Sequence, residues 1–183
     1  MALASLADLK QWLGVVSNAD DALLERLIDA AGGFIDRYLG RQVAETTHDE
    51  TYDGNGGPTL ALPLLPGQRV SEVLSLAIFD RPIPPASGAR APGYRLHGDV
   101  VTLVGEVYPR GVRNVAIVYR AGYATPPPEI AQACIELAAL RYRERERIGH
   151  ASKSVGGETV SFVLDDMPAP TRTLLDGYRR VVL

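Results

Sequence analysis

The residues best suited to chemistry in this sequence lie in the stretch HDETYDGNGG, residues 48–57. A histidine and three acids gather there: His48, Asp49, Glu50 and Asp53. Such groups bind metal ions or transfer protons. A calcium-binding EF-hand loop, however, needs a glutamate at its twelfth position, and the twelfth residue from Asp49 is Leu60. DGNGG also lacks the Gly-Lys-Ser/Thr of a phosphate-binding loop. We therefore expect a solvated strand and a tight turn, without a metal.

Three other residues carry groups that are often catalytic: Cys134, His97 and His150. Cys134 lies among alanine and isoleucine, which is typical of a small buried residue, and the chain has no second cysteine. The histidines are isolated, and no Gly-x-Ser-x-Gly, His-Glu-x-x-His or Cys-x-x-Cys motif occurs. The absence of these motifs argues against an enzyme but does not exclude one. A hydrolase using Asp49, Asp53 or His97 is kept as an alternative.

The charged run RYRERER, residues 141–147, could bind a partner. Its four arginines outnumber its two glutamates, so positive charge is in excess. Three interpretations stay open: a solvated helix end, arginines that pair with carboxylates of a neighbouring subunit, or a basic surface beside DNA phosphates. The candidate interface or channel residues are Arg141, Arg143, Glu144, Arg145, Glu146 and Arg147.

A long helix is predicted to carry this run. EIAQACIELAALRYRERERIG consists of strong helix formers and has no glycine or proline before Gly149. Three prolines, 126–128, precede it. Because the amides of the first helical turn have no intrahelical partner, prolines cost little there. We expect a helix over 126–148 with Thr125 as its N-cap.

Two more helices are predicted near the N-terminus. Ser5 and Asp8 have the spacing of a capping box, and three leucines follow on one face. The second helix is expected to begin near Ser17 or Asn18. Inside it, Gly32-Gly33 costs about 1 kcal/mol per residue relative to alanine, so we expect the close approach of another helix, or a kink.

Between the helices, residues 43–123 contain short β-branched runs bounded by glycine and proline, which predicts an antiparallel β insertion. After residue 149 a glycine-hinged extended arm and a short helix are expected, and the apolar side of the arm is formed by Val160, Phe162 and Leu164. The predicted fold class is α+β. Its parts are N-terminal helices 1–42, β insertion 43–123, long helix 124–148, and arm with C-terminal helix 149–183.

Composition limits the range of functions. Of the 183 residues, 46% are hydrophobic and 22% charged, as in ordinary globular proteins. The net charge of −3 argues against a strongly basic nucleic-acid binder, so any DNA contact must be local. No segment approaches the roughly 20 apolar residues of a membrane span. We expect a soluble protein made in the cytoplasm, with no membrane partner.

The order of these parts resembles the head-tail connector, or adaptor, proteins of long-tailed bacteriophages and of gene transfer agents. The resemblance rests on the helix pair LADLKQWLGV and DDALLERLIDAAGGFIDRYLGR, then on VYRAGYATPPPEIAQACIELAALRYRERE, and finally on LLDGYRR. It covers roughly residues 1–42 and 117–180, and no match is claimed for the central insertion.

This resemblance implies a structural virion protein without a reaction or cofactor. Family members form a ring, commonly of twelve subunits, that lies below the portal, continues the channel for double-stranded DNA and receives the stopper or tail. The implied location is the head-tail interface of the virion, after assembly in the host cytoplasm. The arm would then reach a neighbour or the portal. The residues chosen for portal docking are Leu174, Leu175, Tyr178, Arg179 and Arg180.

The alternative function is a β module, residues 43–123, that binds a ligand such as a glycan. It would use aromatic side chains of the insertion: Tyr52, Phe79, Tyr94, Tyr108 and Tyr119. For the connector, we expect that removal of residues 156–183 leaves a folded protein that no longer attaches to its partner.

Overall fold

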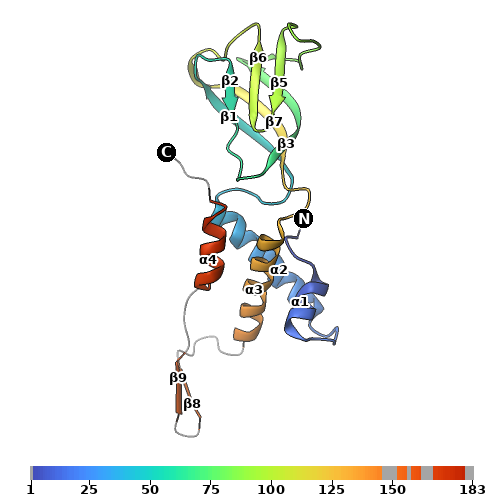
Figure 1. Ribbon diagram of the computed structural model, residues 1–183, viewed down its shortest axis with the longest axis vertical. Helices are drawn as coiled ribbons and strands as arrows, with labels where there is room; N and C mark the ends of the chain where they lie inside the picture. Colours follow the sequence, from blue (N-terminus) through green and yellow to red (C-terminus); the bar gives the residue numbers. More distant parts are fainter. Residues whose placement is uncertain (1, 146–151, 156–157, 162–166, 180–183) are drawn as a thin grey trace. The chain divides into compact units, whose positions relative to one another are not determined.

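The computed structural model describes residues 2–145, 152–155, 158–161 and 167–179 (Figure 1). The chain forms two compact units. The helical unit consists of Met1–Gly40 and Pro126–Arg179, and the β unit spans Arg41–Thr125. Helices together with antiparallel sheets confirm the predicted α+β class.

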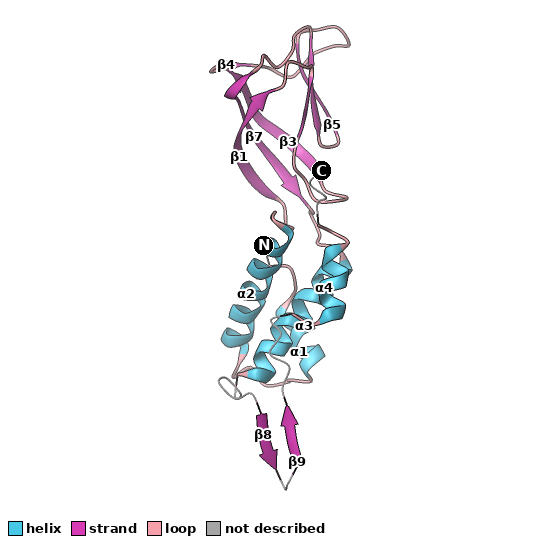
Figure 2. Cartoon of the chain, turned by 90° about the vertical axis from the view of Figure 1, so that its left-hand side faces the viewer, coloured by secondary structure: helices cyan, strands magenta, loops and turns pink. Residues whose placement is uncertain are grey.

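The described helices all belong to the helical unit and are drawn in cyan in Figure 2. They are α1 (Leu6–Leu13), α2 (Asp21–Leu39), α3 (Pro128–Glu144) and α4 (Ala169–Asp176). Helices α2 and α3 form the centre of the unit, since each of them packs against the other three helices. The shorter helices α1 and α4 pack against this pair. The buried face of α3 includes the small residues Ala133, Ala138 and Ala139, which let the neighbouring helices approach closely. None of the described helices is both long and apolar enough to cross a membrane.

One half of the predicted capping box at the start of α1 is confirmed: Ser5 is the N-cap, whereas the Asp8 carboxylate bonds to the Ser5 hydroxyl and not to its amide. The Ser5 hydroxyl accepts a hydrogen bond from the Asp8 amide at 3.1 Å and donates one to the Asp8 carboxylate at 2.5 Å. The start of α2 was predicted a few residues too early. The Ser17 hydroxyl accepts from the Ala19 amide, and the Asn18 carbonyl accepts from the Asp21 amide, so this segment forms a turn before the helix.

The start of α3 also differs from the prediction. The helix begins at Pro128 with Pro127 as its N-cap, and Thr125 is not the cap. Pro127 has an extended backbone, with φ −52° and ψ 139°. A proline disfavours helical geometry in the residue before it. Thr125, Pro126 and Pro127 each precede a proline, so the helix can begin only at the last one.

The two glycines of α2 have different surroundings. A Cβ atom on Gly32 would lie 3.6 Å from the Leu3 side chain, so the segment before α1 fills the space beside it. The expected close neighbour is thus a side chain of the segment before α1 and not a helix. Gly33 is exposed, and a Cβ atom there would meet nothing within 4 Å.

The C-terminal helix α4 is part of the core of the helical unit. Leu175 and, just before the helix, Met167 are buried at 0% and 2% exposure. The Thr171 hydroxyl donates a hydrogen bond to Glu136 of α3 at 3.0 Å. Removal of residues 156–183 would therefore take buried side chains out of the core, so a destabilising effect on the helical unit is expected besides the loss of attachment.

The β unit contains two antiparallel sheets (Figure 2). The first has the order β1-β7-β3-β4 and the second β2-β6-β5. Their strands are β1 (Thr46–Gly54), β2 (Thr59–Ala61), β3 (Arg69–Ile78), β4 (Arg81–Pro82), β5 (Gly93–His97), β6 (Val100–Val104) and β7 (Gly111–Gly122). Buried side chains from both sheets form one core, among them Leu76, Val101, Ile117 and Tyr119.

The segment predicted as a single extended arm contains a hairpin instead. Strand β8 (Ser152–Val155) pairs antiparallel with β9 (Glu158–Ser161). The paired stretch is short and polar, and its sequence places Gly-Gly between the strands, which is typical of a tight hairpin connection. Val160 lies in β9, whereas Phe162 and Leu164 lie outside the described residues.

Candidate interaction surfaces

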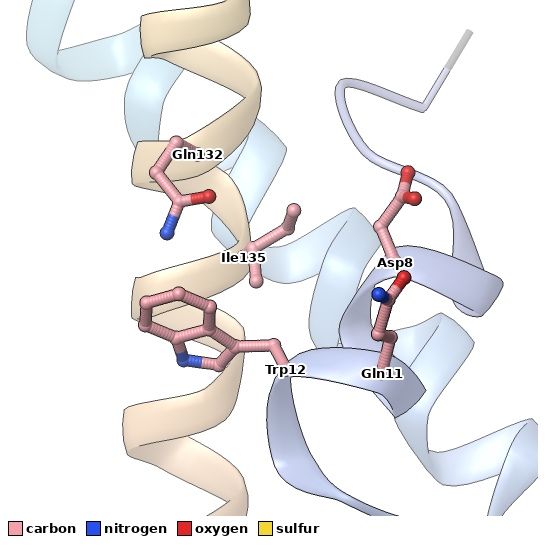
Figure 3. A pocket seen from close by; sticks show the side chains of 5 residues that line it. All are labelled: Asp8, Gln11, Trp12, Gln132 and Ile135. Carbon is pink, nitrogen blue, oxygen red and sulfur yellow. The ribbon is translucent and has the colours of Figure 1, made fainter.

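A pocket of about 480 Å³ opens between α1 and α3 (Figure 3). Its lining residues are Asp8, Gln11, Trp12, Gln132 and Ile135. The polar residues of α1 follow from helical spacing: Leu9 of the same helix is fully buried, which leaves its neighbours Asp8 and Gln11 on the exposed side. The pocket thus combines one carboxylate, two amides, an indole ring and an apolar floor.

Trp12 is half exposed, at 50%, although tryptophan is usually well buried. Ile135, which also lines the pocket, is almost completely covered, at 8% exposure. The Ser5 hydroxyl holds the Asp8 carboxylate by its hydrogen bond to Oδ2, and Gln132 donates to Glu136 at 3.1 Å. Side chains fixed in this way present a preformed surface to a partner.

The arginine-rich end of α3 is partly tied to its own unit. The Arg141 guanidinium lies 5.4 Å from the centre of the Phe34 ring of α2. Arg145 lies 3.8 Å from the centre of the Tyr142 ring and donates to the Tyr142 carbonyl at 2.9 Å. These cation–π contacts hold two of the predicted residues against aromatic side chains.

The remaining residues of the run differ in exposure. Arg143 is exposed and Glu144 half-buried, while Glu146 and Arg147 lie outside the described residues. The Tyr142 hydroxyl donates a hydrogen bond to Asp20, which raises the pKa of Tyr142. The structure therefore places Arg143 on the surface next to an anchored tyrosine.

The residues predicted to dock on a portal lie in different environments. Leu175 is fully buried within the helical unit, so its side chain supports the core. Leu174 is half-buried, and Arg180 lies outside the described residues. The Tyr178 hydroxyl donates to Glu129 at 3.3 Å. Exposed Arg179 lies 3.6 Å from Asp176 in an ion pair that solvent largely screens.

A cluster of polar side chains is half-buried at one edge of the β unit. Arg41 forms two hydrogen bonds with the Glu50 carboxylate, in the fork geometry typical of arginine. The hydroxyls of Tyr52 and Tyr119 both donate to the same carboxylate, Tyr119 at 2.7 Å. His48 stacks on the Tyr119 ring with 5.1 Å between centroids.

These contacts shift the pKa values of the cluster. Burial would raise the pKa of Glu50, but the hydrogen bonds from Arg41, Tyr52 and Tyr119 outweigh it and lower the value to about 2. Burial, assisted by the positive charge of Arg41, lowers the pKa of His48. At neutral pH the cluster therefore contains an ionised Glu50 and an uncharged histidine.

The residues proposed for hydrolysis do not form one site. Asp49 is exposed on β1, and the Asp53 carboxylate accepts a hydrogen bond from the Arg113 amide at 2.6 Å. His97 ends β5, which belongs to the other sheet. Among the described residues, no group of three histidines, cysteines or acids could hold a metal ion.

Most aromatic residues of the β unit serve its core. Tyr108 and Tyr119 are buried, and Tyr52 and Tyr94 pack against the same cluster. Phe79, at 63% exposure, is the exception in this group. The described aromatics thus do not offer the row of exposed rings that would stack on a sugar. Cys134 is also buried, as its sequence context predicts, and burial raises the pKa of its thiol to about 12.

The family model described as "Head completion protein" matches residues 2–181. The chain belongs to the head completion protein family. This assignment confirms the resemblance to head-tail connectors that the order of the helices and of the proline junction indicated. No curated protein matches the chain.

Solved structures of gene transfer agent (GTA) particles contain chains of the same fold. A chain in "Neck of empty GTA particle computed with C6 symmetry" is 21% identical, with a TM-score of 0.66, over 99% of this chain and 91% of that one. A chain in "Virion of native gene transfer agent (GTA) particle" has a TM-score of 0.65, with the same identity and the same coverage of both chains. A chain in "Neck of native GTA particle computed with C12 symmetry" has a TM-score of 0.62 at 21% identity. The match covers 97% of this chain and 89% of that one.

Sequence reasoning missed two features of this head completion family member. It predicted a solvated strand and turn for the HDETYDGNGG stretch. The strand is present, but His48, Glu50 and Tyr52 alternate along β1 and share its half-buried face. That period of two was a usable signal. It also missed the pocket at Trp12, because α1 and α3 are distant in sequence and only packing brings them together.

Proposed function

We propose that this chain is a structural neck protein that forms a closed ring between the portal and the stopper or tail. The proposal follows from its membership of the head completion family. The single observation that carries it is the common fold, over 97% of this chain, with a chain of a neck computed with C12 symmetry. A ring of twelve copies is accordingly proposed here.

The ring would extend the DNA channel of the portal. DNA must slide through such a channel, so a net charge of −3 suits a wall that does not hold phosphates tightly. Exposed Arg143 would supply a local positive charge beside DNA or beside a neighbouring carboxylate. Neither role requires a reaction or a cofactor.

For the portal contact we propose the exposed side of the C-terminal segment, with half-buried Leu174 and Tyr178 and exposed Arg179. Leu175 would act indirectly by fixing α4 on the core. The hairpin of β8 and β9 would extend the contact, since two isolated strands are only marginally stable in water and gain from pairing with another chain.

Assembly is tested with the purified full-length chain, alone and with tailless, portal-bearing particles. We expect a discrete species close to twelve times the 19.7 kDa chain, or a ring on the portal vertex in negative-stain images. If the chain stays monomeric both alone and with the particles, the proposed ring is wrong.

The position of Arg143 is tested by Arg143→Gln. If it pairs with a neighbouring subunit, the variant should assemble less readily. A ring of normal mass that loses packaged DNA more quickly would place Arg143 in the channel instead.

A further inference from the structure

We propose that the pocket between α1 and α3 receives an arginine from the outer face of α2 in the neighbouring copy. The inference rests on the proposed ring and names its lateral contact. Figure 3 shows the residues that line this pocket.

The pocket lining suits a flat cationic side chain. The Asp8 carboxylate would offset a positive charge, and the side-chain carbonyl oxygens of Gln11 and Gln132 accept hydrogen bonds. The half-exposed Trp12 ring offers a face for a cation–π contact, which arginine makes more often than lysine. A purely apolar partner would satisfy none of the remaining acceptors on the Asp8 carboxylate and on the Gln11 and Gln132 amides in a buried contact.

The chain itself carries suitable arginines on the outer face of α2. With 3.6 residues per turn, Arg26 and Gly33 lie opposite the buried stripe of Leu24, Ile28 and Ile35. Arg26 is exposed, as is Arg37 farther along the same face. Exposed Gly33 between them removes bulk from this face, so another helix can come close.

The two surfaces lie on different sides of one unit. Figure 3 shows α2 behind the helices that line the pocket, and the outer face of α2 is turned away from them. A ring of identical copies needs two such unlike surfaces, because each subunit contacts the next head to tail. Exposed Glu25 and Asp29 flank Arg26 on α2, so the charge pairing is local to Asp8 and Arg26, and this pair would set the register between neighbours. We assign Arg26 as the residue that enters the pocket.

Cross-linking tests the contact in the full-length protein. Gln11→Cys places a thiol at the rim of the pocket, and Ala30→Cys places one on α2, one helical turn from Arg26. The native Cys134 is buried, so it does not compete for the cross-linker. With a short bismaleimide, each single variant alone should give no dimer. A mixture of the two should give a dimer, and the double variant a ladder.

Two outcomes of this experiment overturn the contact. Dimers of a single variant with itself would indicate a two-fold symmetric interface instead. An assembled ring without any cross-link between the two positions would exclude the pairing of these faces.

Charge reversal gives a second, independent measurement. Arg26→Glu should weaken self-association by about tenfold or more, which is typical of one lost interfacial charge pair. Arg90→Glu, in an exposed segment of the β unit, changes the net charge equally and should leave self-association within about twofold. Trp12→Ala should weaken assembly as Arg26→Glu does.

The outcomes separate this contact from the ring itself. If Arg26→Glu and Trp12→Ala form rings as readily as the unmodified chain, the contact is wrong and the proposed ring stands. If the unmodified chain stays monomeric alone and on portal-bearing particles, both proposals fail.

Discussion

Arg41 and Glu50 show how a charge pair can be held half-buried at a sheet edge. The carboxylate keeps its charge because three side chains donate hydrogen bonds to it. Arg41 is the first residue of the β unit, whereas Glu50 lies in the middle of β1. The pair therefore fixes the entry of the chain onto its first strand.

We predict that Glu50→Gln lowers the free energy of unfolding by about 3 kcal/mol at pH 7, because Arg41 loses its buried partner. The unmodified chain should lose the Glu50 contribution as the pH falls from about 4.5 towards 2. The sign follows because the unfolded chain binds this proton at a higher pH than the folded chain. Urea unfolding at pH 7 and at pH 3 measures both effects.

The matched control is Asp49→Asn, one residue away on the exposed face of β1. It should change the free energy of unfolding by less than about 0.5 kcal/mol. Equal losses in the two variants, or the same pH dependence in Glu50→Gln as in the unmodified chain, would contradict the role of the cluster.

At the scale of elements, the sequence predicted the type and order of most helices and strands but not their exact ends. The prolines correctly indicated a helix start, yet the effect of each proline on its predecessor moved that start to Pro128. Apolar spacing predicted α2. Its start at Asp21 lies after the prediction because Ser17 and Asn18 form hydrogen bonds with the following backbone and make a turn there. Leu175 was assigned to a docking surface because amphipathic spacing shows that a face is buried without showing by what.

We predict that Gly33→Ala raises the free energy of unfolding of the isolated chain by about 1 kcal/mol. Alanine is the better helix former, and the new Cβ atom meets no neighbour. Thermal unfolding followed by circular dichroism measures the change.

Gly122→Ala is the contrasting variant. Gly122 has φ 137°, and a Cβ atom there would lie 2.5 Å from the backbone of Glu45. We expect a loss of about 2 kcal/mol or more. Destabilisation by Gly33→Ala would show that the exposed glycine has a role within its own chain.

Leu175→Ala should lower the free energy of unfolding by about 3 kcal/mol, because it leaves a cavity under α4. Leu174→Ala, at a half-buried position, should cost about 1 kcal/mol. Chemical denaturation compares the two. Similar small losses in both variants would mean that Leu175 is not a core residue, and the assignment of α4 to the helical unit would fail.

The whole molecule consists of two units of which one interrupts the other. Composition and the change from helical to strand periodicity predicted such an insertion. They could not predict that the two ends of the insertion are hydrogen-bonded to each other. Where the insertion ends, the Tyr123 amide donates to the Val43 carbonyl at 2.9 Å, and the Glu45 amide donates to the Tyr123 carbonyl at 3.1 Å. These long-range hydrogen bonds join residues about 80 positions apart, which local sequence patterns do not reveal.

We predict that Arg41–Thr125 folds when it is expressed alone, since it has its own core and its two ends are joined. Dispersed amide signals in a nuclear magnetic resonance spectrum would demonstrate this. A collapsed spectrum would show that the β unit depends on the helices. The same fragment tests the alternative function, because a ligand-binding module should bind its ligand without the helical unit.

The hydrogen-bonded base at Val43, Glu45 and Tyr123 also makes the β unit replaceable. A different domain could occupy its place, provided that its ends lie equally close together, and α2 and α3 would still meet across the same core. Recombination between related genes could then exchange one appendage for another. The helical unit would keep its own core while the chain acquired a new surface.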